Sequence, residues 1–210
     1  MRQLIKTHPY ILWVLYLPCY LILFIIAEQL ITTDYWVSYC PLDDQIPFIP
    51  QFVIAYVLWY PLMIGTGLFF LWKDPDTFVR YMYSVSIGLT ASLVICLLFP
   101  NGQELRPELA ASDPFRWILC KIYAADTNTY VLPSMHVVGT MAAVFAWFHT
   151  KVPCAKWVRP GLVVLGLLIN FSTVFVKQHS FLDIVTGLVL ALVVWFLSYR
   201  VLPRPKISGG

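Results

Sequence analysis

The chain has 210 residues, of which 60% are hydrophobic and 12% charged, and its formal net charge is +3. Soluble domains carry about 25% charged residues, so this composition excludes a domain that water surrounds on all sides. The positive charge is small and scattered, which does not favour a nucleic-acid partner. Because no segment looks like a linker, residues 1–210 are expected to form a single integral-membrane catalytic domain.

Long apolar runs dominate the chain, and a helix needs about 20 such residues to cross a bilayer. The first run follows Arg2 and Lys6, as in a signal peptide, but it is too long and lacks a cleavage pattern, so we expect it to be retained. The pattern predicts an all-α membrane protein with six transmembrane helices. The six runs cover residues 10–31, 51–72, 79–99, 133–150, 160–177 and 180–200.

Basic residues separate across this predicted topology. Of the 14 Lys and Arg residues, ten fall beside the two termini or in the 73–80 and 151–159 loops. The positive-inside rule therefore predicts cytoplasmic N- and C-termini. The opposite face is then extracytoplasmic or lumenal, in a plasma, bacterial inner or secretory-pathway membrane. The four basic residues on that outer face are Arg106, Arg116, Lys121 and Lys177.

One candidate site begins the fourth apolar run, LPSMHVVGTMAAVF. Pro133 suits the first turn of a helix, where its missing N–H would be unpaired anyway. The N–H groups of Ser134, Met135 and His136 are then expected to point out of the helix start and to form an anion site, for which phosphate is the expected ligand. His136 can donate a proton to that anion or accept one from it.

A second candidate site begins the sixth run, in FVKQHSFLDIVTGL. His179 and Asp183 are four residues apart, which places them on one face of a helix. A carboxylate there can hold one imidazole N–H and leave the other nitrogen free as a nucleophile or base. Lys177 lies at the membrane edge, where it can neutralise phosphate oxygens. Arg106 lies in the outer segment 100–132, on the same predicted face.

Taken singly, each of these features has an ordinary structural interpretation, and their conjunction on one predicted face is what indicates a phosphate pocket. His8 and His149 lack such surroundings and are assigned no role. Asp43 and Asp44 are expected to lie in a solvated turn. The five cysteines do not have a metal-binding spacing, and we expect neither a metal nor another cofactor.

Together, Arg106-Pro107, the run PSMH at 133–136 and the pair His179 and Asp183 resemble the three-part signature of the phosphatidic acid phosphatase type 2 superfamily. The resemblance implies a metal-independent reaction at the outer face. It assigns His179 as the nucleophile that forms a phosphohistidine, Asp183 as its orienting group and His136 as the acid for the leaving group. Arginine, lysine and helix-start amides would hold the phosphate.

Three positions depart from that signature. Phe99 stands where the family has a lysine, Met135 replaces a glycine, and Thr173 replaces an arginine. Lys177 is the first candidate to replace the missing cations, followed by Lys121 and Arg116. A bulky residue within the PSxH motif and the Lys-x-His-x-x-x-Asp ending look more like the branch with sphingolipid and inositol phosphorylceramide synthases.

The residues and the resemblance leave three hypotheses. The first is a membrane phosphatase that hydrolyses a phosphate monoester or diphosphate of a lipid, such as a phosphatidate or a polyprenyl phosphate. The second is a phosphotransferase that moves a phospho-headgroup to an alcohol acceptor. The third is a small transporter whose His–Asp pair relays protons without catalysis. Soluble haloperoxidases resemble the same superfamily, but the composition argues against one.

Overall fold

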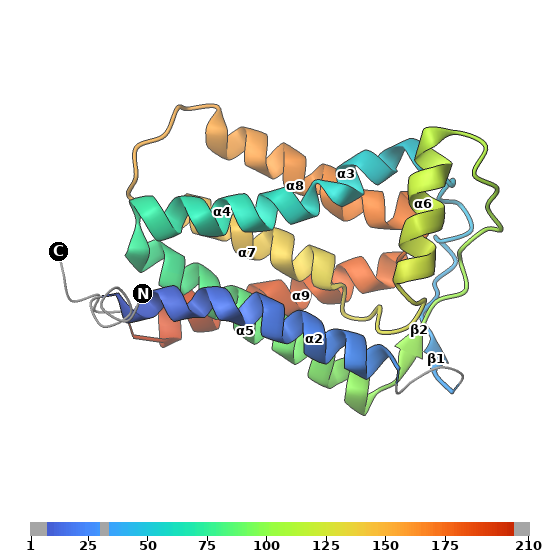
Figure 1. Ribbon diagram of the computed structural model, residues 1–210, viewed down its shortest axis with the longest axis horizontal. Helices are drawn as coiled ribbons and strands as arrows, with labels where there is room; N and C mark the ends of the chain where they lie inside the picture. Colours follow the sequence, from blue (N-terminus) through green and yellow to red (C-terminus); the bar gives the residue numbers. More distant parts are fainter. Residues whose placement is uncertain (1–7, 30–33, 204–210) are drawn as a thin grey trace.

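The computed structural model describes residues 8–29 and 34–203. Within these ranges the chain is mostly helical, and the helices lie side by side in a bundle (Figure 1). The helical elements are η1 (Pro9–Leu15), α2 (Tyr16–Glu28), η2 (Pro50–Phe52), α3 (Val53–Val57), α4 (Trp59–Lys73), α5 (Pro75–Leu98), α6 (Pro114–Ala125), α7 (Met135–His149), α8 (Val158–Phe175), α9 (Phe181–Phe196) and η3 (Leu197–Val201). The strands are β1 (Trp36–Val37) and β2 (Asn101–Gly102).

Among the described residues, five helical segments are long and apolar enough to cross a membrane, one fewer than the six predicted spans. The exception is α7, which has 15 residues. At 1.5 Å per residue it is about 22 Å long, whereas the hydrocarbon core is about 30 Å thick. The six-span layout and its sidedness remain predictions, and Arg2, Lys6, Arg204 and Lys206 lie outside the described residues. The five segments are Pro9–Glu28, Pro50–Lys73, Pro75–Leu98, Val158–Phe175 and Phe181–Val201.

The short helix α7 is the centre of the bundle and packs against α4, α5, α8 and α9. Small residues allow its neighbours to approach closely. A Cβ atom built on Gly88 of α5 would lie 2.4 Å from Val138 Cγ1, and one built on Gly187 of α9 would lie 3.0 Å from the Ser134 carbonyl oxygen. Close approach through small residues is the usual way in which membrane helices pack without a hydrophobic driving force.

The N-terminal helix α2 has fewer helical neighbours than α7. It packs on α5, and most of its apolar side chains point away from the protein; Leu21 is 56% exposed and Ile22 is 60% exposed. In a bilayer such side chains contact lipid tails, so this exposure is expected for a helix at the edge of a membrane bundle.

Loops gather at one end of the bundle, where α6 lies across the helix ends (Figure 1). The helix α6 is not among the predicted ones, because it is short and amphipathic and lies in the outer segment 100–132. Its Leu119 is buried against Val53 and Tyr56 of α3. The strand β1 pairs in parallel with β2. These contacts fix the segment 34–49 and the segment 99–134 around the starts of α7 and α9.

Candidate active site

The two predicted histidines, 43 positions apart in the sequence, lie beside each other in the structure. His136 is in the first turn of α7, and His179 is just before α9; their ring centroids are 5.7 Å apart. Both rings line one end of a cavity of about 720 Å³, a size within the range of small-molecule sites. The structure therefore brings the second and third sequence motifs into one pocket.

Both ring nitrogens of His179 have partners. Nδ1 is 3.1 Å from Asp183 Oδ2, and Nε2 is 3.3 Å from Ser134 Oγ. Because Asp183 is fully buried, its carboxylate favours the tautomer with the proton on Nδ1. Nε2 then presents a lone pair beside the Ser134 hydroxyl. The main-chain N–H of His179 donates to the Thr173 carbonyl, which fixes the backbone before α9.

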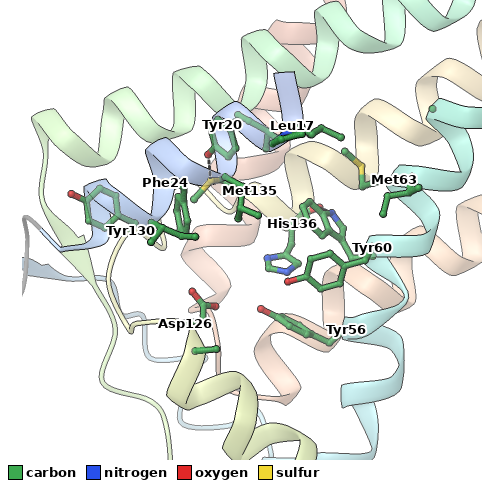
Figure 2. Close-up of a pocket in the computed structure, with 18 of the residues that line it drawn as sticks. Leu17, Tyr20, Phe24, Tyr56, Tyr60, Met63, Asp126, Tyr130, Met135 and His136 are labelled. Carbon is green, nitrogen blue, oxygen red and sulfur yellow. Dashed lines mark hydrogen bonds between the residues drawn. The ribbon is translucent and has the colours of Figure 1, made fainter. Parts of the chain in front are cut away.

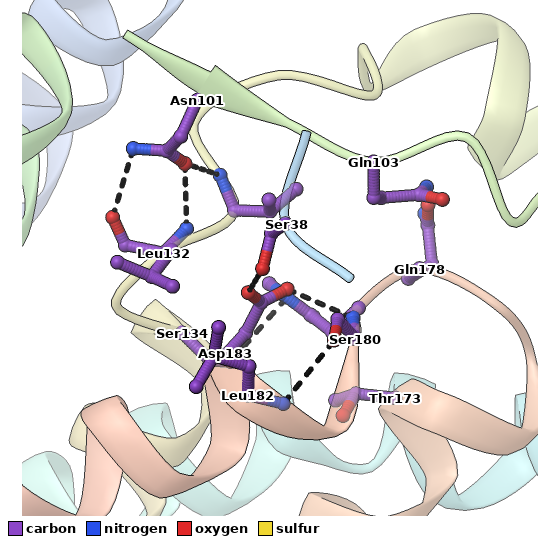
Figure 3. A network of polar contacts seen from close by, with 12 residues as sticks. Ser38, Asn101, Gln103, Leu132, Ser134, Thr173, Gln178, Ser180, Leu182 and Asp183 are labelled. Atoms are coloured by element: carbon purple, nitrogen blue, oxygen red, sulfur yellow. Dashed lines mark hydrogen bonds and ion pairs between the residues drawn. The ribbon is translucent and has the colours of Figure 1, made fainter. Parts of the chain in front are cut away.

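Asp183 holds the start of α9 as well as the imidazole. It forms a capping box with Ser180, whose N–H donates to Asp183 Oδ2 at 2.9 Å. The Ser38 hydroxyl donates to the other oxygen, Oδ1 (Figure 3). Three donors thus surround a single buried carboxylate, as a buried charge requires. Sequence reasoning missed Ser38, since nothing near it in the chain indicates its partner 145 positions away.

Asp43 corrects a prediction. We expected a solvated turn, but the Asp43 side chain is buried, with only 2% of its surface exposed. Its oxygens accept hydrogen bonds from the Ser180 hydroxyl at 2.6 Å and from the Phe181 N–H at 2.8 Å. A carboxylate at this position satisfies unpaired N–H groups and interacts favourably with the positive end of the helix dipole. The segment 34–49 therefore supports the site by holding the start of α9 in place.

His136 has quite different surroundings. Its ring packs between Tyr56 and Trp59, with centroids 4.5 and 4.7 Å away, and the Trp59 indole N–H donates to the His136 carbonyl. Within the described ranges, its Nε2 atom is buried and has no hydrogen-bond partner. Aromatic packing thus positions this imidazole and leaves one nitrogen available to a ligand (Figure 2).

The start of α7 differs from the prediction in two respects. The helix begins at Met135 with Ser134 as its N-cap, so Pro133 precedes the helix instead of opening it. The Ser134 N–H donates to the Asp183 carbonyl at 3.1 Å, which makes this amide unavailable to an anion. The next two amides, of Met135 and His136, are the ones that a helix start leaves without a helical partner.

Neither of the two predicted phosphate cations lines the cavity with the histidines. Arg106 donates to the carbonyl oxygens of Asp126, at 2.9 Å, and of Thr127, and burial lowers its pKa. Lys177 Nζ donates to the carbonyls of Asp43 and Ile46 at 2.9 and 2.7 Å. Each cation instead satisfies backbone carbonyls. Those that Arg106 satisfies lie at the end of α6, and those that Lys177 satisfies lie in the segment 34–49.

Two acidic residues that sequence reasoning overlooked line the same pocket as the histidines: Glu28, at the end of α2, and Asp126, after α6. Glu28 accepts hydrogen bonds from the N–H and hydroxyl of Thr127. Burial and the nearby Glu28 raise the pKa of Asp126 to about 6. A carboxyl group at the end of an apolar run was the available signal for Glu28.

Comparison with known proteins identifies the family of the chain. The PAP2 superfamily matches residues 81–206, a range that contains both histidines and Asp183. The undecaprenyl-diphosphatase BcrC of Bacillus subtilis (strain 168) is 26% identical over 161 residues, which cover 76% of this chain and 74% of that protein. No solved structure matches the chain. The family match spans more than half of the sequence and confirms the resemblance seen in its motifs: the chain belongs to the PAP2 superfamily.

Proposed function

We propose that this protein is an integral-membrane phosphatase that hydrolyses a phosphate monoester or diphosphate of a lipid. The observation that carries the proposal is the placement of His179 between Asp183 and Ser134 at the end of a largely apolar cavity. Family membership supports phosphatase chemistry. The similarity to an undecaprenyl-diphosphatase favours a polyprenyl diphosphate among the lipid substrates.

In the first step, His179 Nε2 attacks the phosphorus. The P–N bond forms as the bond from phosphorus to the leaving oxygen breaks, and His136 Nε2 supplies the proton that this oxygen takes up. Asp183, 3.1 Å from Nδ1, stabilises the positive charge that develops on the His179 ring. The Asp183 carboxylate remains fixed, because it also caps α9.

In the second step, water attacks the phosphohistidine. His136 accepts a proton from the water, the P–N bond breaks, and inorganic phosphate leaves. We assign the Ser134 hydroxyl, which lies 3.3 Å from His179 Nε2, and the first-turn N–H groups of Met135 and His136, which have no partner within the helix, to the phosphate oxygens. Arg106 and Lys177 support the site by holding its loops. Among the described residues, Arg106 Nε has no hydrogen-bond partner, and it is the donor of this cation that we assign to a phosphate oxygen.

Headgroup transfer to an alcohol is the second candidate. The Met135 side chain lines the cavity beside His136, so an apolar wall stands where a glycine would leave room for water. A lipid hydroxyl would then replace water in the second step. The two candidates share the first step and differ in their products, inorganic phosphate or a new phospholipid.

The test is to incubate the purified protein with radiolabelled lipid phosphates and diphosphates, with and without diacylglycerol, ceramide or inositol, and to resolve phosphate and lipid products. We expect phosphate release that His179→Ala lowers at least about 10³-fold, and that a metal chelator leaves unchanged. His149→Ala, at the far end of α7 from His136, is the control and should keep full activity. Full activity of His179→Ala would contradict the proposal.

A further inference from the structure

Apart from the two histidines, the charged side chains that line the cavity are acidic. They are Glu28 and Asp126, and no lysine or arginine lines it within the described residues. Glu28 is only 6% exposed, and burial and the proximity of Glu28 raise the pKa of Asp126 to about 6. A phosphate group is itself an anion, so two carboxylates at the same end of the cavity weaken its binding unless a cation offsets them.

Arg106 supplies only part of that offset. Its guanidinium donates to the main-chain carbonyls of Asp126 and Thr127. One guanidinium offsets at most one of the two carboxylate charges, and the phosphate oxygens add further negative charge. Even with a protonated His136, Arg106 and the lining residues leave this end of the cavity negatively charged when phosphate binds.

The oxygen atoms at this end of the cavity have few hydrogen-bond donors. Thr127 donates twice to a single oxygen of Glu28, Oε1, and Gln178 Nε2 donates to Asp126 Oδ2 at 3.3 Å. The Gln178 side chain lines the cavity and is only 2% exposed, yet its Oε1 atom has no partner in the part of the chain that the structure describes. Carboxylate and amide oxygens only accept hydrogen bonds, so a ligand at this place must donate them.

Aromatic rings line the same end of the cavity. Phe24 and Tyr130 lie on one side of Asp126, and Tyr56 and Tyr60 lie on the other (Figure 2). The negative face of an aromatic ring attracts a cation, and such rings are the usual lining of sites for organic ammonium groups. A metal ion would instead need several oxygen ligands, and the described residues contain no group of three or more His, Cys, Asp or Glu side chains that could hold one.

We propose that Glu28, Asp126 and Gln178 form an ammonium subsite, which binds an amino group of the substrate. The ammonium N–H groups donate to the free oxygens, and the positive charge offsets the carboxylates. Gln178 directly precedes His179, so the amino group must be within a few bonds of the phosphorus. The shortest stable unit of this kind is N–C–C–O–P. This inference rests on the proposed phosphohistidine chemistry and narrows its substrates to lipids with that unit, which a polyprenyl diphosphate lacks.

Two kinds of lipid contain the N–C–C–O–P unit, and they differ in where the amine goes. In a 2-aminoalkyl phosphate, the amine is on the alcohol, which takes the proton from His136 and leaves as the P–N bond to His179 forms. In an ethanolamine phospholipid, diacylglycerol takes that proton and leaves, and the amine stays on the phosphoryl group bound to His179. In both lipids the nitrogen is the same number of bonds from the phosphorus.

Pairs of substrates that differ only in this charge test the subsite. The first pair is 2-aminooctadecyl phosphate and 2-methyloctadecyl phosphate. The second is phosphatidylethanolamine and phosphatidylpropanol, in which a methyl group replaces the ammonium group. We expect the wild type to prefer the ammonium lipid of at least one pair, by at least about tenfold in kcat/KM for donor consumption, as hydrogen bonds to a charged group imply. Preference in the first pair places the amine on the leaving alcohol, and preference in the second places it on the transferred group. No preference in either pair would overturn the inference.

Neutral substitutions locate the preference. Asp126→Asn and Glu28→Gln keep the shape of each side chain and remove its charge, and each should lower the ratio of kcat/KM within the preferred pair at least about fivefold. Asp126→Asn should fold, because burial already disfavours the charged form of Asp126. Asp44→Asn, which removes an exposed charge from the segment 34–49, is the control and should keep the ratio of the wild type. An unchanged ratio in both Asp126→Asn and Glu28→Gln, or an equal fall in Asp44→Asn, would overturn the inference.

A binding measurement separates this inference from the proposed function. The His179→Ala protein cannot form the phosphohistidine, and in detergent micelles it should bind at least one ammonium lipid more tightly than the methyl partner of that lipid, as measured by calorimetry. Tighter binding of an ammonium lipid without turnover by the wild type would contradict the phosphatase and keep the subsite. Turnover by the wild type with equal binding within both pairs would contradict the ammonium subsite alone.

Discussion

The bundle has a tightly packed side and an open side, and the proposed chemistry lies where they meet. On the packed side, α5, α7 and α9 approach so closely that Gly88 and Gly187 leave no room for a methyl group without displacing a neighbour. On the open side, a cavity separates α2 from α4. His179 and Asp183 belong to the packed side, and the aromatic wall of His136 borders the open side.

This difference suits two separate requirements, which are rigid positioning of the catalytic groups and access for the substrate. A nucleophile must be held within a fraction of an ångström of its productive geometry, which requires rigid packing and fully satisfied hydrogen bonds. A lipid must enter and leave, which requires helices that can separate at low cost. The same bundle meets both demands because α2 is bound mainly to α5, whereas α9 is fixed at its start by Asp43, Ser38 and Asp183.

The largest expected effect comes from Asp183→Asn, which breaks the packed side at the proposed nucleophile. An amide cannot accept hydrogen bonds from Ser38, Ser180 and His179 as the carboxylate does. We expect kcat to fall about 10³-fold, because the His179 tautomer and its developing charge lose their support. Phosphate release under substrate saturation measures this.

Asp43→Asn is the matched control for Asp183→Asn. Asp43 is also a buried carboxylate at the start of α9, but it contacts Ser180 and Phe181 and neither histidine. Asp43→Asn and Asp183→Asn should each lower the free energy of unfolding by about 1–3 kcal/mol, but Asp43→Asn should lower kcat much less. Equal losses of kcat in the two variants would mean that Asp183 acts only through the helix start.

Glycine substitutions compare the packing of the two sides directly. A Cβ atom on Gly88 would lie 2.4 Å from Val138 Cγ1, whereas one on Gly65 would meet nothing. Gly88→Ala should destabilise the protein by about 3 kcal/mol, and Gly65→Ala should be neutral or stabilising by up to about 1 kcal/mol. Thermal unfolding in detergent measures both. A neutral Gly88→Ala would show that α5 and α7 can move apart freely.

The smallest expected effect concerns Asp126, at the polar end of the cavity. Burial, and then Glu28, raise its pKa from 3.8 to about 6 in the folded protein. The folded state therefore binds this proton more tightly than the unfolded state. The resulting stability is present below about pH 4 and is lost as the pH rises through about 6. Relative to Asp126→Asn, the wild type should lose about 2 kcal/mol between pH 4 and pH 7.

Asp113 is the control for that pH dependence, because it caps the opposite end of α6. Hydrogen bonds from the backbone and side chain of Arg116 lower its pKa. The contribution of Asp113 to the free energy of unfolding therefore has the opposite pH dependence. It is present above the pKa of the unfolded state and is lost as the pH falls through the pKa of the folded state. Chemical or thermal unfolding at several pH values distinguishes the two. A flat profile for Asp126 would indicate that water reaches this carboxyl group.

Local periodicity accounts for what the sequence could predict. His179 and Asp183 lie on one helix face because their spacing matches the helical repeat. The apolar runs predicted the five candidate spanning segments to within four residues at either end. The meeting of His136 with His179 also followed, since both begin helices on the same predicted side.

Contacts between residues far apart in the chain account for the features that could not be predicted from the sequence. Asp43 and Ser38 contact α9 from about 140 positions away, and no local pattern encodes that distance. Arg106 looked like a free cation because α6, whose terminal carbonyls it satisfies, was not foreseen. No local pattern indicates that Lys177 Nζ donates to the carbonyls of Asp43 and Ile46, and its role as a phosphate ligand stays a prediction.

The shortness of α7 has a consequence for water. Its last turn is level with the start of α5, because the Thr150 hydroxyl, just after α7, donates to Asp74, just before α5. With 15 residues against the 24 of α5, α7 stops roughly 14 Å short of the far end of its neighbour. His136, in the first turn of α7, therefore lies far below the end of α5 at which the loops gather. In the proposed reaction the lipid phosphate would come from the bilayer and the water from the loop end of the bundle, so the two reactants would reach this depth from two different solvents.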